Sequence, residues 1–336
     1  MNLPEQLSIL RWLAHDTFRQ ARASGILWLM LGINALAIVF CLSVGMDEPR
    51  PLREGDEPAH FLPRTEKLSE AQRRGAAVEP ITGDLTLLFG AVRVPLFRDG
   101  HAGVRFIKVV LAKWVAGTAG LLLTLIWTAG FLPSFLEPGA ATVLLAKPTP
   151  RWLLLLGKYL GVLAFVALTA GIFFVGTWLA LGLRTGLLAP EYLLSYPLLL
   201  LQFLIIYSAS AVLAVWTRST VVCVFGSILF WLVCFGMNYG RHALVALPFL
   251  DPLSTALPAS ATYSVEIGYW CLPKPADLGI LLDNLLGTRE HFTGPKEFAV
   301  VQEQGAFQPW LSVFSSLAFS VLGLVIAARH LEQTDY

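Results

Sequence analysis

The sequence predicts an all-α integral membrane protein: six transmembrane helices, an N-terminal interfacial amphipathic helix and a short cytoplasmic helix between the second and third spans. Three observations predict this fold. Only 14% of the 336 residues are charged, against about 25% in ordinary soluble domains. Six stretches contain close to the roughly 20 apolar residues that a membrane-spanning helix needs. Basic residues gather in the short flanks on one side of those stretches, as membrane topology requires.

The apolar stretches define the predicted spans. The first follows a basic helix and has no small-residue cleavage pattern after it, so we expect it to be retained rather than removed as a signal peptide. Asn34 and Gln202 are the conspicuous polar side chains at depth. Lys108, Lys113 and Lys158 lie near span ends, where we expect their long stems to carry the charge towards water. The spans are 25–45, 106–132, 152–183, 193–216, 219–239 and 310–330.

The basic flanks orient the chain. They predict that both termini, including the 331–336 tail, are cytoplasmic in the inner or plasma membrane. Tryptophans then fall at both interfaces, which is the usual aromatic-belt pattern. The flanking bases are Arg11, Arg19, Arg22, Lys147, Arg151, Lys158, Arg218 and Arg329. The tryptophans are Trp28, Trp152 and Trp216 on the inner side, and Trp114, Trp178 and Trp310 on the outer side.

Two long loops, 46–105 and 240–309, are expected outside the membrane. The first opens with a polar, proline-rich tract that has little apolar surface to fold around, so we interpret it as partly flexible. Its more apolar part, 85–97, is expected to lie flat at the outer interface. In the second loop, 242–258 is apolar but interrupted by three prolines. It is too short to cross, and we expect it to form a re-entrant segment.

Residues 1–24 are expected to form a helix along the cytoplasmic membrane surface. Arg11, His15, Arg19 and Arg22 recur at spacings of four, four and three, so they form one basic stripe. Leucines fall mainly on another face. Such a helix can bury its apolar side among acyl chains while its bases meet anionic headgroups of the bilayer. The alternative is an ordinary positive flank of the first span, without a separate role.

A capped helix is predicted in the 133–151 segment. Ser134 and Glu137 have the spacing of a capping box. Pro138 equally suits a first helical turn that begins after Glu137. Either start gives a helix of two to three turns, ending near Ala146.

Its end is marked as clearly as its start. Lys147 is placed to meet the exposed carbonyls, and Pro148 stops the helix. Thr149 and Pro150 suit the N-cap and first position of the third span. The sequence thus predicts a short rigid helix held between two spans; the alternative is a simple intracellular turn.

This stretch resembles the ABC-2-type permeases, the membrane subunits of ATP-driven exporters. The family typically has an acidic residue, Gly-Thr, a leucine-rich stretch, Pro-x-x-Arg, and Gly-Lys opening the third span. The chain departs from that pattern at Ala140, where Thr is usual, and at Pro150, where a small hydroxyl residue is common. It matches the pattern with Glu137, Gly139, Leu144, Leu145, Pro148, Arg151, Gly157 and Lys158.

The resemblance implies a partner and a role. In this family the short helix is the coupling helix, which docks on a separate cytoplasmic ATPase that binds ATP and Mg²⁺. It also implies a second permease subunit, identical or different, and transport in the direction of export. The ATPase-coupling residues that it implies are Ser134, Glu137, Gly139, Thr142, Leu144, Leu145, Lys147, Pro148, Arg151, Gly157 and Lys158.

Other function classes find less support in the sequence. It contains no phosphate-binding G-x-x-x-x-G-K-[ST] motif and no hydrolase or metalloprotease signature, so we expect no enzyme activity and no cofactor in this chain itself. Its four cysteines have no CxxC pairing, and no basic cluster suggests nucleic acid. A non-transporting scaffold or sensor on the same fold remains an alternative. An ion-coupled secondary carrier is less favoured, because the predicted spans show no acidic or basic group at mid-depth.

Small residues on two spans suggest close helix contacts, either within the chain or with a second subunit. On the third span these are Gly171 and Gly176, and on the fourth they are Ser208, Ser210, Ala211 and Ala214.

Overall fold

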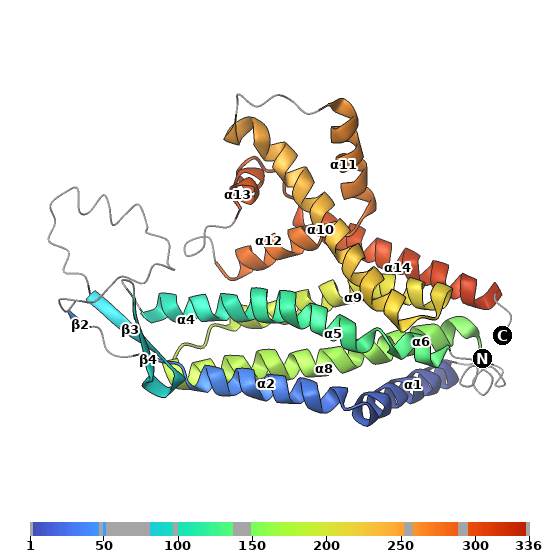
Figure 1. Cartoon of the computed structure of the whole chain (residues 1–336), viewed down its shortest axis with the longest axis horizontal. Coiled ribbons are helices and arrows are strands. Elements are labelled where there is room, and N and C mark those ends of the chain that lie inside the picture. Colours follow the sequence, from blue (N-terminus) through green and yellow to red (C-terminus); the bar gives the residue numbers. More distant parts are fainter. Residues whose placement is uncertain are drawn as a thin grey trace.

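The computed structural model describes residues 3–46, 50–51, 81–96, 100–136, 149–251, 258–287 and 295–333. Helices dominate these residues (Figure 1). In the first half they are α1 (Leu3–Ala23), α2 (Ile26–Leu42), α4 (Gly100–Val109), the π-helix η2 (Val110–Gly120), α5 (Leu121–Thr128) and α6 (Phe131–Phe135). In the second half they are α8 (Arg151–Thr185), η3 (Pro190–Leu194), α9 (Ser195–Thr217), α10 (Thr220–Leu250), α11 (Ala259–Cys271), α12 (Pro275–Leu285), α13 (Lys296–Glu303) and α14 (Pro309–Gln333).

The chain has the character of a multi-pass membrane protein. Five helical stretches are long and apolar enough to cross a membrane, and there are six if the bent pair α1–α2 counts as one. Four of the five have bounds within three residues of the predicted spans. The five stretches are Gly103–Phe135, Arg151–Thr185, Pro190–Thr217, Thr220–Leu250 and Pro309–Gln333.

The spans run between two ends of the molecule. At one end Gln20 contacts Ser134, and Arg151 contacts the backbone of Leu331. At the opposite end strand β1 (Gly45–Met46) pairs with strand β3 (Ile81–Leu87). Figure 1 shows both termini and α6 at the first end and the sheet at the other. We call these the α6 end and the sheet end.

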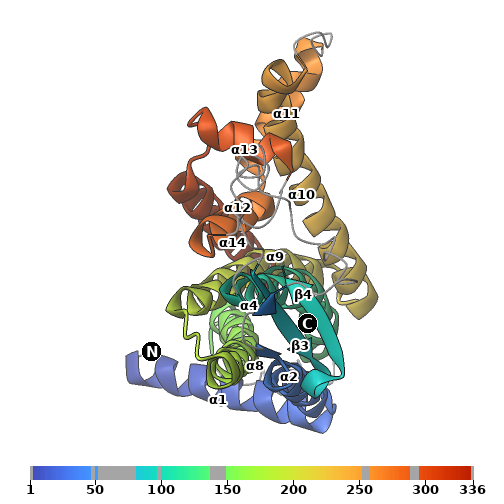
Figure 2. The ribbon, with the colours of Figure 1, turned by 90° about the vertical axis from the view of Figure 1, so that its left-hand side faces the viewer.

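The N-terminal helix turns sharply before α2. The axes of α1 and α2 differ by 75°. Gly25 adopts the left-handed conformation at the junction, with φ of 76°, which a residue without Cβ adopts at little cost. Figures 1 and 2 place α1 and α2 on one side of the bundle, with α10 to α14 on the other.

A small antiparallel sheet is the main departure from the predicted fold. Strand β3 pairs with β4 (Val92–Leu96) on one edge and with β1 and β2 (Arg50–Pro51) on the other. Within segment 85–97, which we expected to lie flat at an interface, residues 85–87 and 92–96 belong to the two strands of a hairpin. The turn passes through Leu88 and Phe89, both at positive φ. The sequence did contain a pattern for this hairpin. Apolar residues alternate at 92, 94 and 96, and a period of two indicates a strand.

The predicted re-entrant segment is also different in the structure. Residues 242–250 continue α10 without a break, although Pro248 lies inside the helix. Helix α10 therefore has 31 residues and ends eleven residues beyond the predicted boundary at 239. A proline near a helix end removes one backbone hydrogen bond, which the preceding turns can tolerate. Residues 252–257 lie outside the described part of the chain.

The small residues of α8 and α9 serve contacts within the chain. The four small residues of α9 are buried between helices of the same molecule. A Cβ added at Gly171 would touch Tyr196, and one at Gly176 would overlap Ile38. Of the two kinds of close contact that we considered, within the chain or with a second subunit, the buried α9 positions make the first. Those positions are Ser208, Ser210, Ala211 and Ala214.

Candidate functional site

The coupling-helix residues fall on both sides of a gap in the described chain. Ser134 lies in α6 before it, and Arg151, Gly157 and Lys158 lie in α8 after it. The remaining predicted residues lie outside the described residues: Glu137, Gly139, Thr142, Leu144, Leu145, Lys147 and Pro148. The geometry of the site is therefore that of its two flanks.

Lys158 is the centre of a polar cluster at the α6 end. Its side chain is 1% exposed. The ammonium Nζ lies 2.9 Å from Asp16 Oδ2 and donates a hydrogen bond of 2.8 Å to Gln20 Oε1. It also lies 5.6 Å from the ring centroid of Phe135. We expected Lys158 to extend towards water. Instead it joins α8 to α1 and α6.

Ser134 completes this connection. Gln20 Nε2 donates a hydrogen bond of 2.8 Å to Ser134 Oγ. Ser134 Oγ itself donates to the carbonyl of Phe131, 3.3 Å away. Ser134 therefore lies inside α6, and Glu137, its partner in the predicted capping box, lies outside the described residues. It links α6 to the same glutamine that accepts a hydrogen bond from Lys158.

Close backbone packing holds α1 against α8 beside this cluster. A Cβ at Gly157 would overlap the Leu13 side chain. A Cβ at Gly161 would lie 2.6 Å from Thr17 Oγ1 and 3.2 Å from Ala14 Cα, so only glycine allows this approach. Small residues one turn apart allow helix backbones to come close in membrane proteins. Gly157 of the predicted motif is therefore part of a contact surface for α1.

Arg151 makes a second connection at the α6 end. Its Nη1 donates to the carbonyls of Leu331 and Glu332, at 3.2 and 3.5 Å. These are among the last carbonyls of α14, where a cation is favourable. Pro150, not Thr149, occupies the N-cap of α8, and it caps without a side-chain hydrogen bond. The Thr149 cap that we predicted is wrong because Pro150 is extended, with ψ of 133°.

The basic stripe of α1 faces away from the bundle. Its four members are exposed, whereas Leu13, Thr17 and Ala21 are buried against the protein. Among the apolar residues, Leu7 and Trp12 remain 59% and 49% exposed. Part of the apolar face that we assigned to the membrane is thus used against α8. The stripe consists of Arg11, His15, Arg19 and Arg22.

A second buried polar cluster, absent from the sequence predictions, joins α10, α11, α12 and α14. His242 Nε2 and Asp277 Oδ1 are 2.5 Å apart, and both side chains are fully buried. Tyr269 OH donates to Asp277 Oδ2 at 2.9 Å, and Ser312 Oγ donates to the same oxygen. The backbone N–H of Asp277 donates to Asn238 Oδ1 at 2.9 Å. We call these five residues the Asp277 cluster.

Charged groups surround the Asp277 cluster. Lys274 Nζ donates to Ser315 Oγ at 2.8 Å and lies 4.7 Å from the Tyr269 ring centroid. The Arg241 guanidinium lies 4.4 Å from the same centroid and pairs with Glu266 at 3.5 Å. Two cations therefore flank one buried carboxylate, which favours its ionised form.

The pKa values on α12 and in the turn before it follow this arrangement. Burial acts to raise the pKa of Asp277, but hydrogen bonds from His242, Ser312 and Tyr269 outweigh it and hold the pKa below its ordinary value. Burial lowers the pKa of Lys274, although the nearby Asp277 charge opposes that shift. Asp277 is thus ionised at neutral pH, and its carboxylate is held by hydrogen bonds from three buried side chains.

One sequence signal pointed to this cluster. Asn238, Arg241 and His242 have the i, i+3, i+4 spacing that puts them on one helix face. The sequence alone did not identify this polar face as a site, because its partner Asp277 lies 35 residues further along the chain. His242 is fully buried, as is its partner Asp277.

The other two lysines near span ends also have protein partners. Lys108 Nζ donates to the carbonyl of Leu187 at 2.8 Å. Lys113 pairs with Asp283 of α12 at 2.6 Å. The lysines therefore connect elements of the protein and do not extend into water.

Within the described ranges, no group of three or more His, Cys, Asp and Glu side chains is placed to hold a metal ion.

At the α6 end, Ser134, Gly157 and Lys158 thus gather around α1, and Arg151 contacts α14. The Asp277 cluster forms a separate polar centre. No family model, curated protein or solved structure matches the chain significantly.

Proposed function

We propose that this chain is the permease subunit of an ABC-2-type transporter, coupled to a separate ATPase. One observation carries the proposal. The residues on either side of segment 137–148, Ser134 and Lys158, both bind Gln20 of α1. The segment with the family pattern is thus anchored on both sides to the same helix.

This anchoring suits a coupling element mechanically. Force applied to segment 137–148 would act on α6 and α8 together, because both are joined to α1 by short hydrogen bonds. Lys158 is buried, so its bond to Asp16 is less screened than a surface ion pair. Movement of the segment would therefore displace α1 and α8 as one unit.

The proposal includes the partners and the location. The ATPase would bind ATP and Mg²⁺ and dock at the α6 end, which we assign to the cytoplasm of the inner or plasma membrane. Two permease subunits would form the export pathway. The exposed basic stripe of α1 would contact anionic headgroups, because it points away from the bundle.

The test separates docking from transmission. Asp16→Asn and Lys158→Gln weaken the anchor, whereas Glu137→Lys alters segment 137–148 itself. We expect the anchor variants to co-purify with the ATPase but to lose substrate-stimulated ATP hydrolysis. Glu137→Lys should reduce co-purification, because the new charge opposes a basic partner surface.

Lys113→Gln is the matched control, because it breaks a lysine–aspartate pair elsewhere in the molecule. It should leave both readouts unchanged. If all three test variants showed wild-type co-purification and wild-type stimulated hydrolysis, the proposal would be contradicted. That result would favour a non-transporting scaffold or sensor on the same fold.

A second candidate, an ion-coupled carrier, gains one observation. His242 and Asp277 form a buried acid–base pair, and His242 belongs to a helix apolar enough to span a membrane. Such pairs are typical of proton-coupled transport. Uptake into sealed vesicles driven by a pH gradient alone, and abolished by Asp277→Asn, would favour the carrier; dependence on ATP would exclude it.

A further inference from the structure

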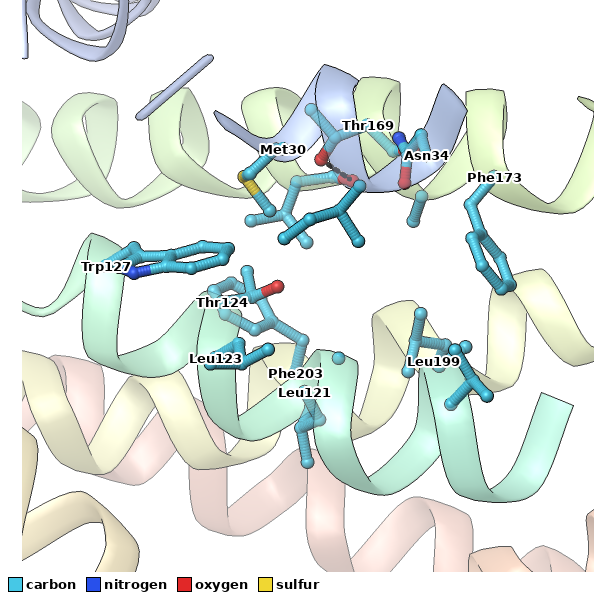
Figure 3. Close-up of a pocket in the computed structure, with 16 residues that line it drawn as sticks. Met30, Asn34, Leu121, Leu123, Thr124, Trp127, Thr169, Phe173, Leu199 and Phe203 are labelled. Atoms are coloured by element: carbon cyan, nitrogen blue, oxygen red, sulfur yellow. Dashed lines mark hydrogen bonds between the residues drawn. The ribbon is translucent and has the colours of Figure 1, made fainter. Parts of the chain in front are cut away.

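A cavity lies halfway along the bundle, between five helical segments. It has a volume of about 90 Å³. Figure 3 shows side chains from α2, α5, α8 and α9 around it, and η2 lines it as well. The lining is mostly apolar and comprises Met30, Ile33, Asn34, Val115, Ala116, Gly120, Leu121, Leu123, Thr124, Trp127, Val166, Thr169, Ala170, Phe173, Leu199 and Phe203.

Its depth follows from the helices that line it. Asn34 is the ninth of the 17 residues of α2, and Thr169 is the nineteenth of the 35 residues of α8. Both positions are midway along helices long enough to reach most of the way across a bilayer. The cavity therefore lies at the level of the hydrocarbon core if these helices span the membrane.

The mouth of the cavity faces the outside of the bundle. Ile33, Val115 and Leu123 at its rim are 37–39% exposed, whereas Phe203 and Leu121 at its base are buried. Apolar cavities of about 150 Å³ stay dry and take up benzene. A cavity of this smaller size, open at one side, suits a branch or the end of a larger apolar molecule.

Two polar atoms in the cavity await a partner. Asn34 Nδ2 donates to the carbonyl of Thr169 at 2.8 Å, which fixes the carboxamide. Among the residues that the structure describes, its Oδ1 and the hydroxyl of Thr124 make no hydrogen bond. Figure 3 shows both oxygens directed towards the open space. A polar group left unpaired in hydrocarbon is costly, so a bound donor would stabilise this arrangement.

The π-helix η2 forms one wall of the cavity. It runs for 11 residues, although π-helices are usually single turns. Such irregular turns are frequent at functional sites. Val115, Ala116 and Gly120 of this helix line the space. The cavity thus combines a specialised backbone, apolar walls and two free acceptors.

We propose that this cavity binds a largely apolar molecule that carries one hydrogen-bond donor, such as a hydroxyl. The apolar part would fill the space between α2, α5 and α8, and the hydroxyl would donate to Asn34 Oδ1 or Thr124 Oγ1. Such a molecule enters from the bilayer or arrives as transported cargo, and the chemistry is the same for both. The inference concerns the isolated chain, so it stands apart from the proposed ATPase partnership.

The test uses photo-crosslinking of the purified chain in phosphatidylcholine nanodiscs. The probe is a long-chain alkanol that carries a diazirine, and its methyl ether is the donor-free comparison. We expect the alkanol to label cavity-lining residues, located by mass spectrometry of the peptides. The near-isosteric Thr124→Val should lower labelling by the alkanol roughly fivefold and leave labelling by the ether unchanged.

Ala170→Leu fills the cavity and should remove labelling by both probes. Its matched control is Ala164→Leu on the exposed face of the same helix, which should not alter labelling. A lipid that co-purifies with wild type, but not with Ala170→Leu, identifies the bilayer as the source; specific labelling without such a lipid identifies an external ligand. Labelling spread over exposed helix faces, and equal in wild type, Thr124→Val and Ala170→Leu, would overturn the proposal.

Discussion

The bundle and the polar module are held together by different interactions. The bundle consists of α2, Gly103–Phe135, α8 and α9; the polar module consists of α11, α12, α13 and the parts of α10 and α14 that contact them. In the most apolar parts of the three long bundle stretches, 39–50% of residues are buried inside the protein. The corresponding values are 17% in α10 and 28% in α14. Figure 1 shows α10 diverging from the bundle.

In the bundle, polar side chains bond mainly to backbone carbonyls. Tyr159 OH donates to Leu204 O at 2.7 Å, and its ring stacks on Tyr207, which stacks on Phe203. Asn34 donates to Thr169 O. Each bond is one of many contacts along a long helix pair. The loss of one contact therefore leaves the neighbouring contacts in place.

In the polar module, side chains bond to one another around a single carboxylate. Asp277 accepts from Tyr269 and Ser312 and pairs with His242. Helices with little apolar burial need such directional contacts to hold their arrangement. This difference means that many contacts share the stabilisation of the bundle, whereas a few contacts around Asp277 stabilise the polar module. Three variants or conditions test this comparison.

The largest expected effect is that of Asp277→Ala. It leaves His242, Tyr269 and Ser312 without their shared partner, and it removes the carboxylate near Lys274 and Arg241. Removing one member of a buried hydrogen-bonded charge cluster in this way typically costs about 3–5 kcal/mol. Thermal unfolding in detergent should show a large loss of stability. Asp283→Ala on the same helix removes a partly exposed pair and should cost about 0–1 kcal/mol. Equal effects of the two variants would refute a concentrated module.

Acid should remove a part of the same contribution. The pKa of Asp277 is held below its ordinary value of 3.8 in the folded protein. Its ionised form therefore stabilises the fold fully above about pH 3.8, and this contribution is lost as pH falls through the folded-state pKa. The difference in melting temperature between wild type and Asp277→Ala should be constant near neutral pH and shrink on acidification. If the difference in melting temperature instead grew below about pH 3.8, the conclusion that ionised Asp277 stabilises the fold would be wrong.

The smallest effect tests the bundle at its closest helix contact. Gly161→Ala places a Cβ 2.6 Å from Thr17 Oγ1 and 3.2 Å from Ala14 Cα, so α1 must shift away from α8. Overpacking of this kind costs about 1–3 kcal/mol. Gly32→Ala on α2 is the control, since a Cβ there meets nothing within 4 Å. Melting curves should show destabilisation by Gly161→Ala alone; equal curves would mean that α1 is not closely packed in solution.

Much of the fold could be predicted because membrane helices are encoded locally. Apolar runs of sufficient length predicted Arg151–Thr185 and Pro309–Gln333 within three residues at each end. The turn before α2 coincides with Gly25, at the predicted boundary between the surface helix and the first span. The β3–β4 hairpin was missed because its apolar alternation was short and lay in a polar loop, although the period was readable at Val92 and Val94.

The site was predictable only in part. The motif placed Ser134, Gly157 and Lys158 near one another in the sequence, but it did not indicate that α1 would be their shared partner. Lys158 meets Asp16 across 142 positions, and His242 meets Asp277 across 35. We interpreted Lys158 as a snorkelling side chain because it lies near the end of a predicted span.

Composition and periodicity by themselves determined the membrane character, the long helices and the basic stripe of α1. These properties depend on how each stretch meets its solvent, which neighbouring residues decide. Tertiary structure alone decided the Lys158 cluster, the Asp277 cluster and the cavity beside Asn34. A buried charge or an open space is defined by groups that converge from distant segments. No local pattern specifies which segments will meet.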